Sequence, residues 1–531
     1  MMTTILKEFK STLEKKPYQR NWFSEHVFLI GDIHNHCNIS YGHGSLKKAI
    51  KFANEQLDFF SVTGHFAWPD MEENKKNLSI PIDVINYHKK GFIKLSNHWE
   101  KYIQILKENN NDNCIAFPSI EFHSFDFGDY TIVSKKLNFT FQPLKQKHDS
   151  RLESLLNGDF DKNNILIFPH HIGYKQGYRG INWNTYNSSH SPVVEVLSMH
   201  GSSESEDSQI KYLHTMGPLN GKNTFLWAFM HDYRFGIIAN TDHHNASPGS
   251  YKNGRTGIWA QSKTRDNIFN ALYKKYTAAI SGDPIEAMMF VNNYCIGEEI
   301  QDVLGNRQVD GYVVACDSLD KVELLQSGNI IETFKANTDS TPPSDIGRIS
   351  FTFGWGEKDV KCDWNVNIQI LNGTIQKVNT RFKGQDIVDP LDKSEDVNFI
   401  IPSLKQLNNK EVELSFSTTG NPTATTSSVQ GISAEYQTND NSKVILNISA
   451  IIDGEKINRE YKYLVKDLKY NHTEYINGFV SPAIEISRFK NKNEYCLEFH
   501  KQIIGEKNDW YYMRVFQKNG DILYLTPIWE K

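Results

Sequence analysis

The sequence predicts an α/β fold over residues 1–304 and an antiparallel β region over residues 305–531. In the first part, apolar runs of strand length alternate with segments whose apolar residues recur at helical spacing. In the second part, short alternating segments are separated by the turn dipeptides Asn372-Gly373, Asp453-Gly454 and Asn519-Gly520. We therefore expect a barrel-like parallel sheet covered by helices, followed by one or two sandwich-like modules.

Composition predicts a multidomain protein of the cytoplasm. The 531 residues include 58 Lys and Arg against 63 Asp and Glu, and this near balance disfavours a nucleic-acid-binding protein. No run approaches about 18 apolar residues, which excludes a membrane span. The N-terminus lacks the apolar segment of a secretory signal. Six widely spaced cysteines form no Cys-x-x-Cys pair, as is usual in a reducing compartment.

The first elements follow from the periodicity of apolar residues. Residues 27–33 form an apolar run of strand length that leads directly into His34. Ser45 can cap a helix whose apolar residues recur every three or four positions. A second apolar run at residues 59–63 ends near His65. This order predicts a strand, a helix and a second parallel strand, with a histidine after each strand.

Polar side chains also follow the later apolar runs. The runs at residues 115–120, 165–168, 193–198 and 236–240 lead into Glu121, His170-His171, His200 and Asp242-His243-His244. A long helix is predicted over residues 83–107. The loops after the strands of a parallel barrel converge on one mouth, so we expect these side chains to share a site. The histidine distribution agrees, because only His472 and His500 of the 19 histidines lie beyond residue 244.

The types of side chain at these strand ends indicate a metal centre. His34 and His36 leave the first strand end on the same side, and Asp242 and His244 repeat this spacing. Glu121 carries two oxygens and can bridge two cations. Imidazole and carboxylate ligands without a thiolate favour Zn, Mn or Fe. The coordination shells can be completed by His43, His65, His170, His171 and His200.

The same motifs resemble those of a known family. The segments GDIHNHCNISYGHG, LDFFSVTGH, SIEFH, FPHH and TDHHNASPG occur in the order typical of the PHP (polymerase and histidinol phosphatase) superfamily. Residues 194–206 and 254–281 and the ending YYMRVFQKNGDILYLTPIW are similar to a large bacterial branch of that superfamily with a β-rich tail. The resemblance implies a distorted (β/α)7 barrel, related to the TIM barrel, with a two- or three-metal site that hydrolyses phosphoesters.

The resemblance also implies a ligand set. The first ion would be bound by His34, His36, Glu121 and Asp242, with Glu121 bridging; a further ion by His43, His65 and His244; and the remaining ion by His170 or His171 with His200. The sequence departs from the family pattern at two places. Gly64 replaces the usual acidic residue, and Asp129 stands where many relatives have a histidine, which His123 could replace.

Candidate substrate-binding and catalytic residues lie beside these ligands. Lys175, Tyr178 and Arg179 follow the histidine pair and could hold a phosphate or a carboxylate, although the same loop could simply be solvated. Arg255 is a second candidate of this kind. The catalytic candidates are His171 or His243, either of which could protonate a leaving group, together with Arg179. His26, His88, His98, His148, His190, His214 and His231 are expected to have ordinary structural roles, and Cys37 to be an inert thiol.

These observations predict a metal-dependent hydrolase. The preferred activity is a phosphoesterase that attacks with a metal-bridging hydroxide and acts on an anionic, phosphorylated small molecule, with no nucleic-acid or membrane partner. The same cluster could instead serve an amide, lactone or C–N hydrolase, or an iron-dependent redox enzyme. A binding protein with a degenerate barrel is a third possibility. The sequence leaves the oligomeric state open, and the β region could serve packing, oligomerisation or closure of the barrel.

Overall fold

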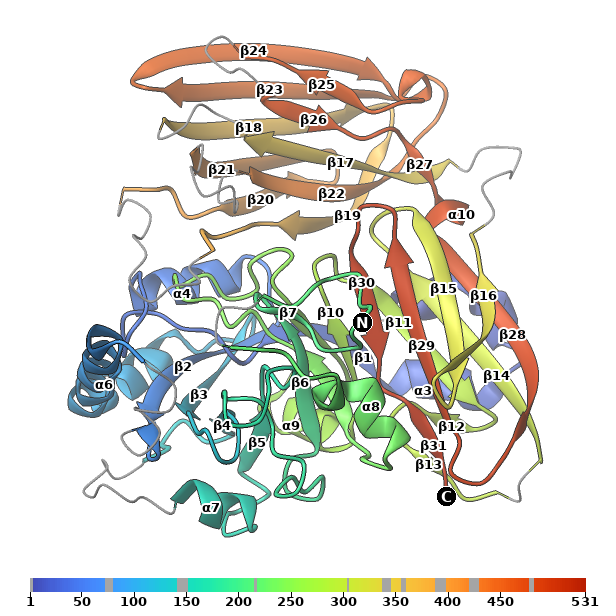
Figure 1. Cartoon of the computed structure of the whole chain (residues 1–531). Helices are drawn as coiled ribbons and strands as arrows, with labels where there is room; N and C mark the ends of the chain where they lie inside the picture. Colours follow the sequence, from blue (N-terminus) through green and yellow to red (C-terminus); the bar gives the residue numbers. More distant parts are fainter. Residues whose placement is uncertain are drawn as a thin grey trace.

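The computed structural model describes residues 3–71, 80–140, 151–213, 217–302, 305–336, 345–354, 360–386, 398–419, 429–476 and 482–531. It confirms the predicted mixed α/β class and is rich in sheet. Figure 1 shows a larger α/β body with a two-layered β unit stacked on one side of it. Among the described residues, α6 included, no helix is both long and apolar enough to cross a membrane.

The central sheet begins with three parallel strands. These are β1 (Val27–Asp32), β2 (Phe59–Ala67) and β3 (Ile115–Phe122), paired in that order. Every residue of β2 and β3 is buried, as expected for strands covered on both faces. The chain between them forms α4 (Leu46–Asn54) and α6 (Ile82–Asn109), which confirms the predicted long helix. The Ser45 side chain accepts a hydrogen bond from the Lys48 amide and caps α4, as predicted.

The distorted (β/α)7 barrel that the resemblance implies is not shown. β4 (Tyr130–Ser134) and β9 (Arg255–Ala260) run antiparallel to β3 and β1, and β5 (Ile165–Pro169) is antiparallel to β4. β6 (Val193–Ser198), β7 (Gly201–Ser202) and β8 (Gly236–Ala239) form a separate small sheet. Within the described ranges no helix connects β5 to β6. Further helical elements after α6 in the described part of this half are α7 (Arg151–Leu156), η1 (Gly221–Asn223), α8 (Phe225–Met230) and α9 (Arg265–Tyr273).

Strands from the end of the chain extend the central sheet. β10 (Thr277–Ile280) pairs with β9 on one side and with β30 (Ile522–Leu525) on the other. The sheet continues through β29 (Trp510–Gln517), β31 (Ile528–Glu530), β13 (Glu299–Ile300), β15 (Leu319–Gln326) and β16 (Asn329–Phe334). Strands from both sides of residue 304 therefore share one sheet, and a domain boundary at 304/305 stays a prediction.

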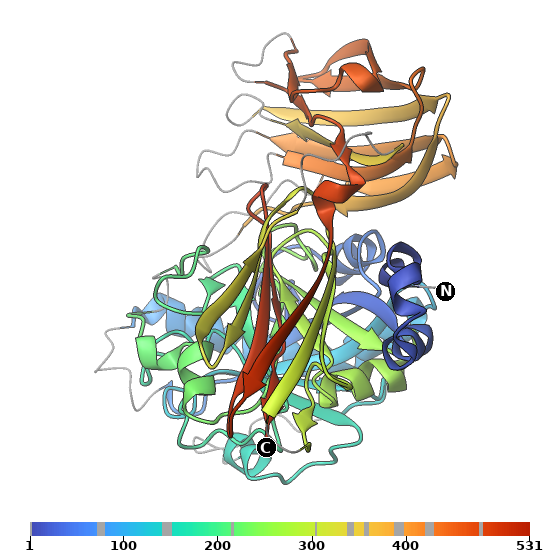
Figure 2. The same cartoon turned by 90° about the vertical axis from the view of Figure 1, so that its right-hand side faces the viewer.

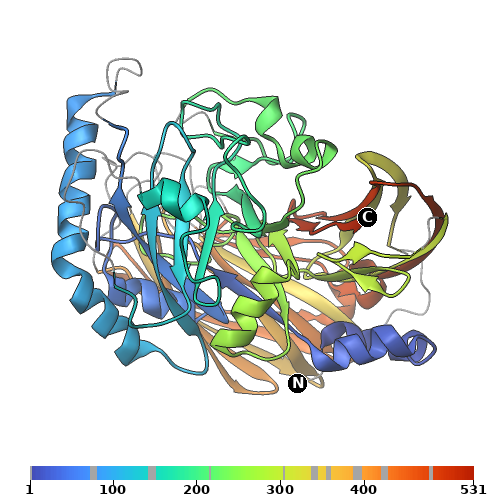
Figure 3. The same cartoon turned by 90° about the horizontal axis from the view of Figure 1, so that it is seen from below.

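A second small sheet supports three short helices at the N-terminus. The sheet contains β11 (Glu286–Val291), β12 (Tyr294–Cys295), β14 (Gly305–Val314) and β28 (Cys496–Gly505). The helices are α1 (Thr4–Glu8), α2 (Lys10–Leu13) and α3 (Pro17–Glu25). Gln19 bonds to Asp310, and Trp22 packs edge-on against Trp259. Figure 3 shows these helices at the opposite end of the body from α6.

The stacked unit is the predicted antiparallel sandwich. One sheet contains β19 (Thr374–Arg381), β22 (Val429–Gln437), β17 (Ile346–Gly354), β26 (Ile484–Ile486), β25 (His472–Glu474) and β27 (Lys490–Asn491). The other contains β20 (Ser403–Asn408), β21 (Glu411–Thr419), β18 (Lys361–Leu371), β23 (Lys443–Ile452) and β24 (Glu455–Leu464). Figure 2 shows the two layers from the side. The segment Thr418–Ser428, expected to be a loop or linker, lies mostly outside the described residues.

Inward-facing side chains hold the sandwich together and join it to α4. Alternate residues of β18 are buried, and Trp364, Phe353 and Phe416 pack together in the core. Phe52 of α4 belongs to the same apolar cluster. Asp453-Gly454 forms the predicted hairpin turn between the paired strands β23 and β24, with a positive φ at Asp453. The hairpin predicted at Asn372-Gly373 is wrong, because this turn joins β18 to β19, which lie in different sheets. The short elements η2 (Val465–Asp467) and α10 (Lys492–Tyr495) lie near the return to the central body.

Candidate metal centre

The predicted strand-end residues converge in a buried cluster. Five overlapping groups, each with its ligand atoms within 4.8 Å of one another, are present among the described residues. They comprise His34, His36, His65, Glu121, His123, Asp129, His170, His171, His200, Asp242 and His244. The convergence follows from the fold, because β1, β2, β3 and β5 present their carboxyl ends to the same side and the loop after β8 reaches across them. The pattern of apolar runs followed by histidines was therefore a valid signal.

Two carboxylates connect the groups. One oxygen of Glu121, Oε2, lies 3.2 Å from Nε2 of His36 and 3.4 Å from Nε2 of His34. Its other oxygen, Oε1, lies 3.1 Å from Nε2 of His170. Asp242 is placed similarly, with Oδ1 3.1 Å from Nε2 of His36 and Oδ2 3.0 Å from Nε2 of His200. Each carboxylate thus offers its two oxygens to different sets of imidazoles.

The hydrogen bonds behind the rings determine which nitrogen is bare. Nδ1 of His36 lies 2.9 Å from the Thr63 carbonyl oxygen, and Nδ1 of His244 lies 2.8 Å from the Asp242 carbonyl oxygen. A carbonyl oxygen only accepts, so in the neutral rings each Nδ1 bears the proton and each Nε2 has a lone pair. The Nε2 atoms of His34 and His36 face each other at 3.3 Å. A cation shared by the two Nε2 atoms would fit this arrangement.

The spacing of these atoms also fits a metal ion. Tetrahedral Zn–N and Zn–O bonds of about 2.0–2.1 Å place neighbouring ligand atoms roughly 3.3 Å apart. The distances from carboxylate oxygens of Glu121 and Asp242 to the Nε2 atoms of the two imidazoles of the first motif range from 3.1 Å to 3.5 Å; these imidazoles belong to His34 and His36. The donor set of imidazoles and carboxylates, without thiolate, suits Zn, Mn or Fe. The residues present therefore fit the metal ions that the sequence predicts.

The electrostatics of Glu121, Asp242, His170 and His244 suit metal binding, whereas Glu195 and Asp242 outweigh burial and raise the pKa of His34. Burial by itself raises the pKa of Glu121 and of Asp242, but the neighbouring imidazoles hold both pKa values well below the usual range. Burial lowers the pKa of His170 to about 4 and that of His244 to about 3. At neutral pH the carboxylates are charged and these two imidazoles are neutral, which are the forms that bind metal ions.

Residues that sequence reasoning missed position the ligands. Oε2 of Glu195, within β6, lies 2.9 Å from Nδ1 of His34 and also accepts a hydrogen bond from Asn240. A carboxylate behind a ligating imidazole fixes its tautomer and orientation. Asp32 accepts hydrogen bonds from the Thr241 hydroxyl and the Gly249 amide, and so fastens the loop that carries Asp242. The available signal was a carboxylate inside or at the end of a buried apolar run.

Arg179 lies against the same cluster. Its Nε donates to Oδ2 of Asp129 at 2.6 Å, and Nη2 lies within hydrogen-bonding distance of Nδ1 of His123. The guanidinium also lies over the Trp68 ring. Arg179 has a φ of 71°, an unusual conformation for this residue type that clusters at functional sites. Asp129 and His123, which the sequence left as alternatives, both belong to the cluster and share this arginine.

Several other predicted residues lie apart from the five groups. The His43 amide bonds to the His244 carbonyl, but the His43 ring is in none of the groups found in the described ranges. Nε2 of His243 lies 4.0 Å from Asp386, on the side of the loop that faces the sandwich. Lys175 is exposed and Tyr178 half-buried. Buried Arg255 donates to the Gly249 carbonyl and the Gln56 side chain, so it supports the loop. Their functional roles stay predictions.

The remaining histidines have mostly ordinary surroundings. His98 and His231 bond to backbone carbonyls of their own helices. His88 is an exception, because it is buried beside Tyr41 and His123 at the edge of the cluster. Cys37 is fully buried, and burial raises its pKa to about 12, in keeping with an inert thiol. His148 and His214 lie outside the described residues.

Comparisons with known proteins give only distant similarities. No family model matches the chain. An uncharacterised protein of Chlamydia trachomatis is 25% identical over 171 residues, covering 29% of this chain and 28% of that protein. An uncharacterised protein of Chlamydia pneumoniae is 24% identical over 191 residues, covering 32% of this chain and 30% of that protein. The chain therefore spans less than a third of the length of these relatives.

Two solved structures are similar at low scores. One is a two-domain protein of Bacteroides vulgatus that contains a predicted PHP-like metal-dependent phosphoesterase, with a TM-score of 0.32 and 14% identity over 60% of this chain and 81% of that chain. The other is PsfC from Pseudomonas syringae, with a TM-score of 0.27 and 12% identity over 44% of this chain and 82% of that chain. At these scores, the assignment of function depends on the geometry of the metal centre itself.

Proposed function

We propose that this protein is a metal-dependent hydrolase that cleaves phosphoesters, with its metal centre in residues 1–304. The observation that supports this most directly is the pair of carboxylates, Glu121 and Asp242, that each lie between different sets of imidazoles. Carboxylates shared in this way are typical of centres that hold two cations about 3.5–4 Å apart. Such centres are common in phosphatases and nucleases.

The ligands divide into a central set and flanking sets. We assign the first ion to His34, His36, Glu121 and Asp242, as the sequence resemblance implies. His171 and His200 face Asp242 from one side, with Nε2 atoms 3.4 Å and 3.0 Å from its Oδ2. His65 and His244 form a third set with His36 on the other side. This arrangement provides for at least two ions, with His171 a ligand rather than the proton donor.

Arg179 fits the role of substrate-binding residue. When bound, the divalent ions would polarise the phosphoryl group and lower the pKa of water. The guanidinium of Arg179 lies 3.9 Å from Glu121 and is held by Asp129, so its direction is fixed. A planar cation with spare N–H groups next to the metal ligands can bind a phosphate oxygen and stabilise its negative charge. Asp129 thereby acts by positioning Arg179.

The chemistry of the centre indicates the substrate class and the compartment. Imidazoles, carboxylates and one arginine suit an anionic, phosphorylated small molecule, which we propose as the substrate. All six cysteines are unpaired thiols. Reduced cysteines agree with the cytoplasmic location that we propose from composition.

The first experiment measures metal content together with hydrolysis. Protein purified without chelators or an affinity metal column is analysed by plasma mass spectrometry and assayed against a panel of phosphomonoesters and phosphodiesters. We expect two or three Zn, Mn or Fe per chain and hydrolysis that chelation abolishes. The Asp242→Ala variant should lose both, whereas Asp266→Asn, at an exposed carboxylate of α9, should lose neither. Hydrolysis that persists in fully metal-free protein would refute the proposal.

A further inference from the structure

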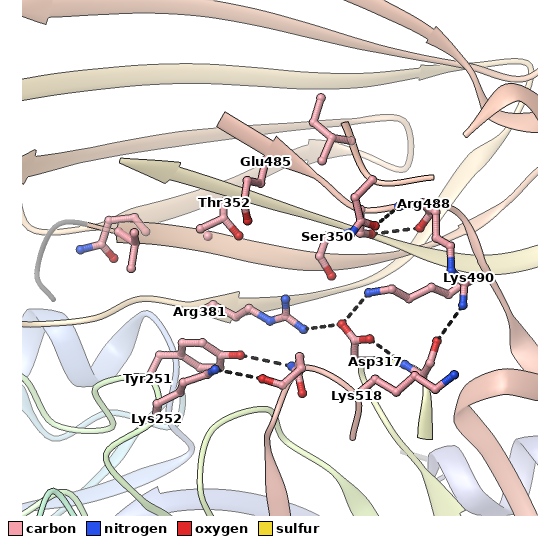
Figure 4. A pocket seen from close by; sticks show the side chains of 18 of the residues that line it. Tyr251, Lys252, Asp317, Ser350, Thr352, Arg381, Glu485, Arg488, Lys490 and Lys518 are labelled. Atoms are coloured by element: carbon pink, nitrogen blue, oxygen red, sulfur yellow. Dashed lines mark hydrogen bonds and ion pairs between the residues drawn. The ribbon is translucent and has the colours of Figure 1, made fainter. Parts of the chain in front are cut away.

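A cavity of about 570 Å³ lies between the sandwich and the central body. Figure 4 shows its side chains, which come from several strands of the sandwich, β17 and β19 among them, and from the loops after β8, β14 and β29. None of its lining residues belongs to the five metal-binding groups among the described residues. Its volume falls in the range of small-molecule sites. The cavity is therefore a separate candidate site.

Basic side chains predominate in its lining. Two acidic residues, Asp317 and Glu485, lie in the wall, against six basic ones: Lys252, Arg381, Lys383, Arg488, Lys490 and Lys518. Glu494 neutralises Arg488 through two hydrogen bonds, and Lys383 lies 3.3 Å from Asp386. These two cations are therefore compensated. Arg381 and Lys490 are likewise paired, with Asp283 and Asp317, so the excess of positive charge rests on the exposed Lys252 and Lys518.

Three buried donors with spare capacity meet inside the cavity. Arg381 uses Nε and Nη2 to bind Asp283, and its Nη1 has no hydrogen bond to any described residue. Lys490 bonds with Nζ to Asp317 and retains further N–H groups. The Ser350 hydroxyl has no hydrogen-bond partner in the described chain. Exposed fractions of 8%, 7% and 6% show that the three side chains are largely removed from water.

An unpartnered buried hydroxyl between two cations requires an explanation. Leaving a buried polar group without a hydrogen bond is unfavourable, so such groups usually have a partner. Ser350 stands on β17, where Ile349 and Phe351 point into the sandwich core, so the hydroxyl faces the other way. Figure 4 shows the hydroxyl oxygen directed toward the side on which Arg381 and Lys490 lie. A hydroxyl and two cationic groups together form a site for an oxyanion.

Neutral polar groups continue the surface beyond these donors. Thr352 follows Ser350 by two residues and shares its face of β17, and Thr473 lies on β25 of the same sheet. Lys252 and Lys518 are exposed at the other side of the opening. Hydroxyl groups beside a cationic pocket suit a ligand that carries both a negative charge and hydroxyl groups.

We propose that this cavity binds a small ligand with an oxyanion group, such as a phosphate, sulfate or carboxylate, on a hydroxyl-bearing body. Arg381, Lys490 and Ser350 hold the oxyanion, and the threonines contact the body. The cavity also adjoins the loop of the metal centre, because the Tyr251 amide donates to the Phe382 carbonyl and the Gly384 amide donates to Ser250. The proposal itself does not depend on the hydrolase activity.

Isothermal titration calorimetry on the full chain tests this proposal. The probes are inorganic phosphate, sulfate, glucose 6-phosphate and, as a neutral control, glucose. We expect glucose 6-phosphate to bind more tightly than phosphate or sulfate, and glucose not to bind. Raising the salt concentration should weaken binding, because the exposed lysines contribute by long-range attraction. Equal binding of glucose and glucose 6-phosphate would contradict the proposal.

Variants then locate the site. Ser350→Ala removes one hydrogen bond to a charged group and should weaken glucose 6-phosphate binding about tenfold. Lys490→Gln should weaken it at least as much. The matched control is Ser433→Ala, because Ser433 pairs with Ser350 across the two strands but already donates to the Cys316 carbonyl and does not line the cavity. Lys456→Gln controls for a lost surface charge on the sandwich.

The metal centre is a possible competing site for these anions. Asp242→Ala disables that centre, so binding to the cavity should survive in this variant with little change in affinity. Binding that Asp242→Ala abolishes, and that Ser350→Ala and Lys490→Gln leave unchanged, would overturn the proposal. Because Ser350→Ala removes an unpartnered hydroxyl, the variant should fold normally, and the test does not depend on the more disruptive replacement of Lys490.

Discussion

The molecule contains two buried polar clusters with opposite needs. In the metal centre, imidazole nitrogens and carboxylate oxygens face one another, and these atoms have lone pairs that can bind a cation. In the cavity under the sandwich, Arg381, Lys490 and Ser350 have N–H and O–H groups to spare. The donor set of the first cluster suits a cation, and that of the second suits the anion that we propose. The unused hydrogen-bond donors and acceptors therefore distinguish the two clusters more clearly than their net charges do.

The two clusters are also built differently. Most ligands of the metal centre stand at the ends of strands or in the loops that follow them, and they converge because those ends point the same way. Ser350 and Thr352 of the cavity stand along the face of one strand and meet the central body only because the sandwich stacks on it. The first design depends on the topology of one body, and the second depends on the contact between two.

The largest expected effect comes from the shared carboxylate of the metal centre. Glu121→Gln keeps the shape of the side chain but replaces one metal-binding oxygen with an amide nitrogen, whose N–H groups would face imidazoles. We expect phosphoester turnover to fall at least about a thousandfold, with loss of bound metal. Steady-state kinetics and plasma mass spectrometry measure the two effects. Glu506→Gln, at an exposed glutamate, is the control, and an equal loss in both variants would contradict the assignment.

A pH-dependent effect is expected next to the cavity. Burial and the Asp283 charge raise the pKa of Asp521 to about 6, whereas Arg381 outweighs burial and lowers the pKa of Asp283 to about 2. The folded chain thus holds the Asp521 proton more tightly than the unfolded chain, so stability falls as pH rises from about 4 to about 6. Asp283 acts in the opposite sense and stabilises above about pH 4, and this contribution is lost as pH falls toward 2.

The Asp521→Asn variant isolates the first of these effects. A neutral amide has no charge to desolvate. The difference in unfolding free energy between the variant and the wild type should therefore shift in favour of the variant by up to about 3 kcal/mol as the pH rises from 4 to 7. Urea denaturation at several pH values gives the difference curve, in which the titration of other groups cancels. Asp440→Asn, at an exposed aspartate, should give a flat difference curve. A flat curve for Asp521→Asn as well would show that Asp521 is not buried as described.

Much of the metal centre could be predicted because its residues follow recognisable strands. A histidine directly after an apolar run is placed by the strand, whether its neighbours are parallel or antiparallel, so His34, His65 and His170 were found without knowledge of the sheet order. The same independence explains why the sequence did not indicate the direction in which two of the strands pair. The apolar runs of β4 and β9 look like any buried strand, and the direction in which they pair depends on distant contacts.

Other parts of the structure left no local signal. Arg179 was proposed from its place after the histidine pair, but its contacts with His123 and Asp129 depend on residues about 50 positions away. The cavity collects residues from eight separate segments of the chain, and Ser350 looks like any serine in a strand. Its lack of a partner becomes visible only when the surrounding donors and acceptors are counted.

A smaller effect is expected from the carboxylate behind the metal ligands. Glu195→Gln replaces the carboxylate that faces Nδ1 of His34 with an amide, while the size of the side chain is retained. Changes of this kind reduce metal affinity about 10- to 100-fold. Competition with a fluorescent chelator measures the affinity. Glu411→Gln on the sandwich is the matched control, because its hydrogen bonds involve surface amides far from the imidazoles. Unchanged affinity in Glu195→Gln would mean that His34 is oriented by packing alone.

The smallest expected effect compares two serines that face each other across β17 and β22. Both are buried, but the Ser433 hydroxyl donates to the Cys316 carbonyl at 2.8 Å, whereas the Ser350 hydroxyl has no partner among the described residues. Ser433→Ala removes a hydrogen bond and leaves a buried carbonyl with less bonding, so the unfolding free energy should fall by about 1–2 kcal/mol. Ser350→Ala removes a group whose burial is already uncompensated, so stability should stay within about 0.5 kcal/mol of the wild type or rise.

Urea denaturation without added anions measures this difference, and repeating it with glucose 6-phosphate sharpens it. A ligand that binds only the folded state raises the unfolding free energy in proportion to the logarithm of its concentration over Kd. Wild type and Ser433→Ala should gain equally from the ligand, whereas Ser350→Ala should gain less. A large loss of stability in Ser350→Ala without ligand would show that the hydroxyl has a structural partner. The main observation that supports an anion site in the cavity would then be removed.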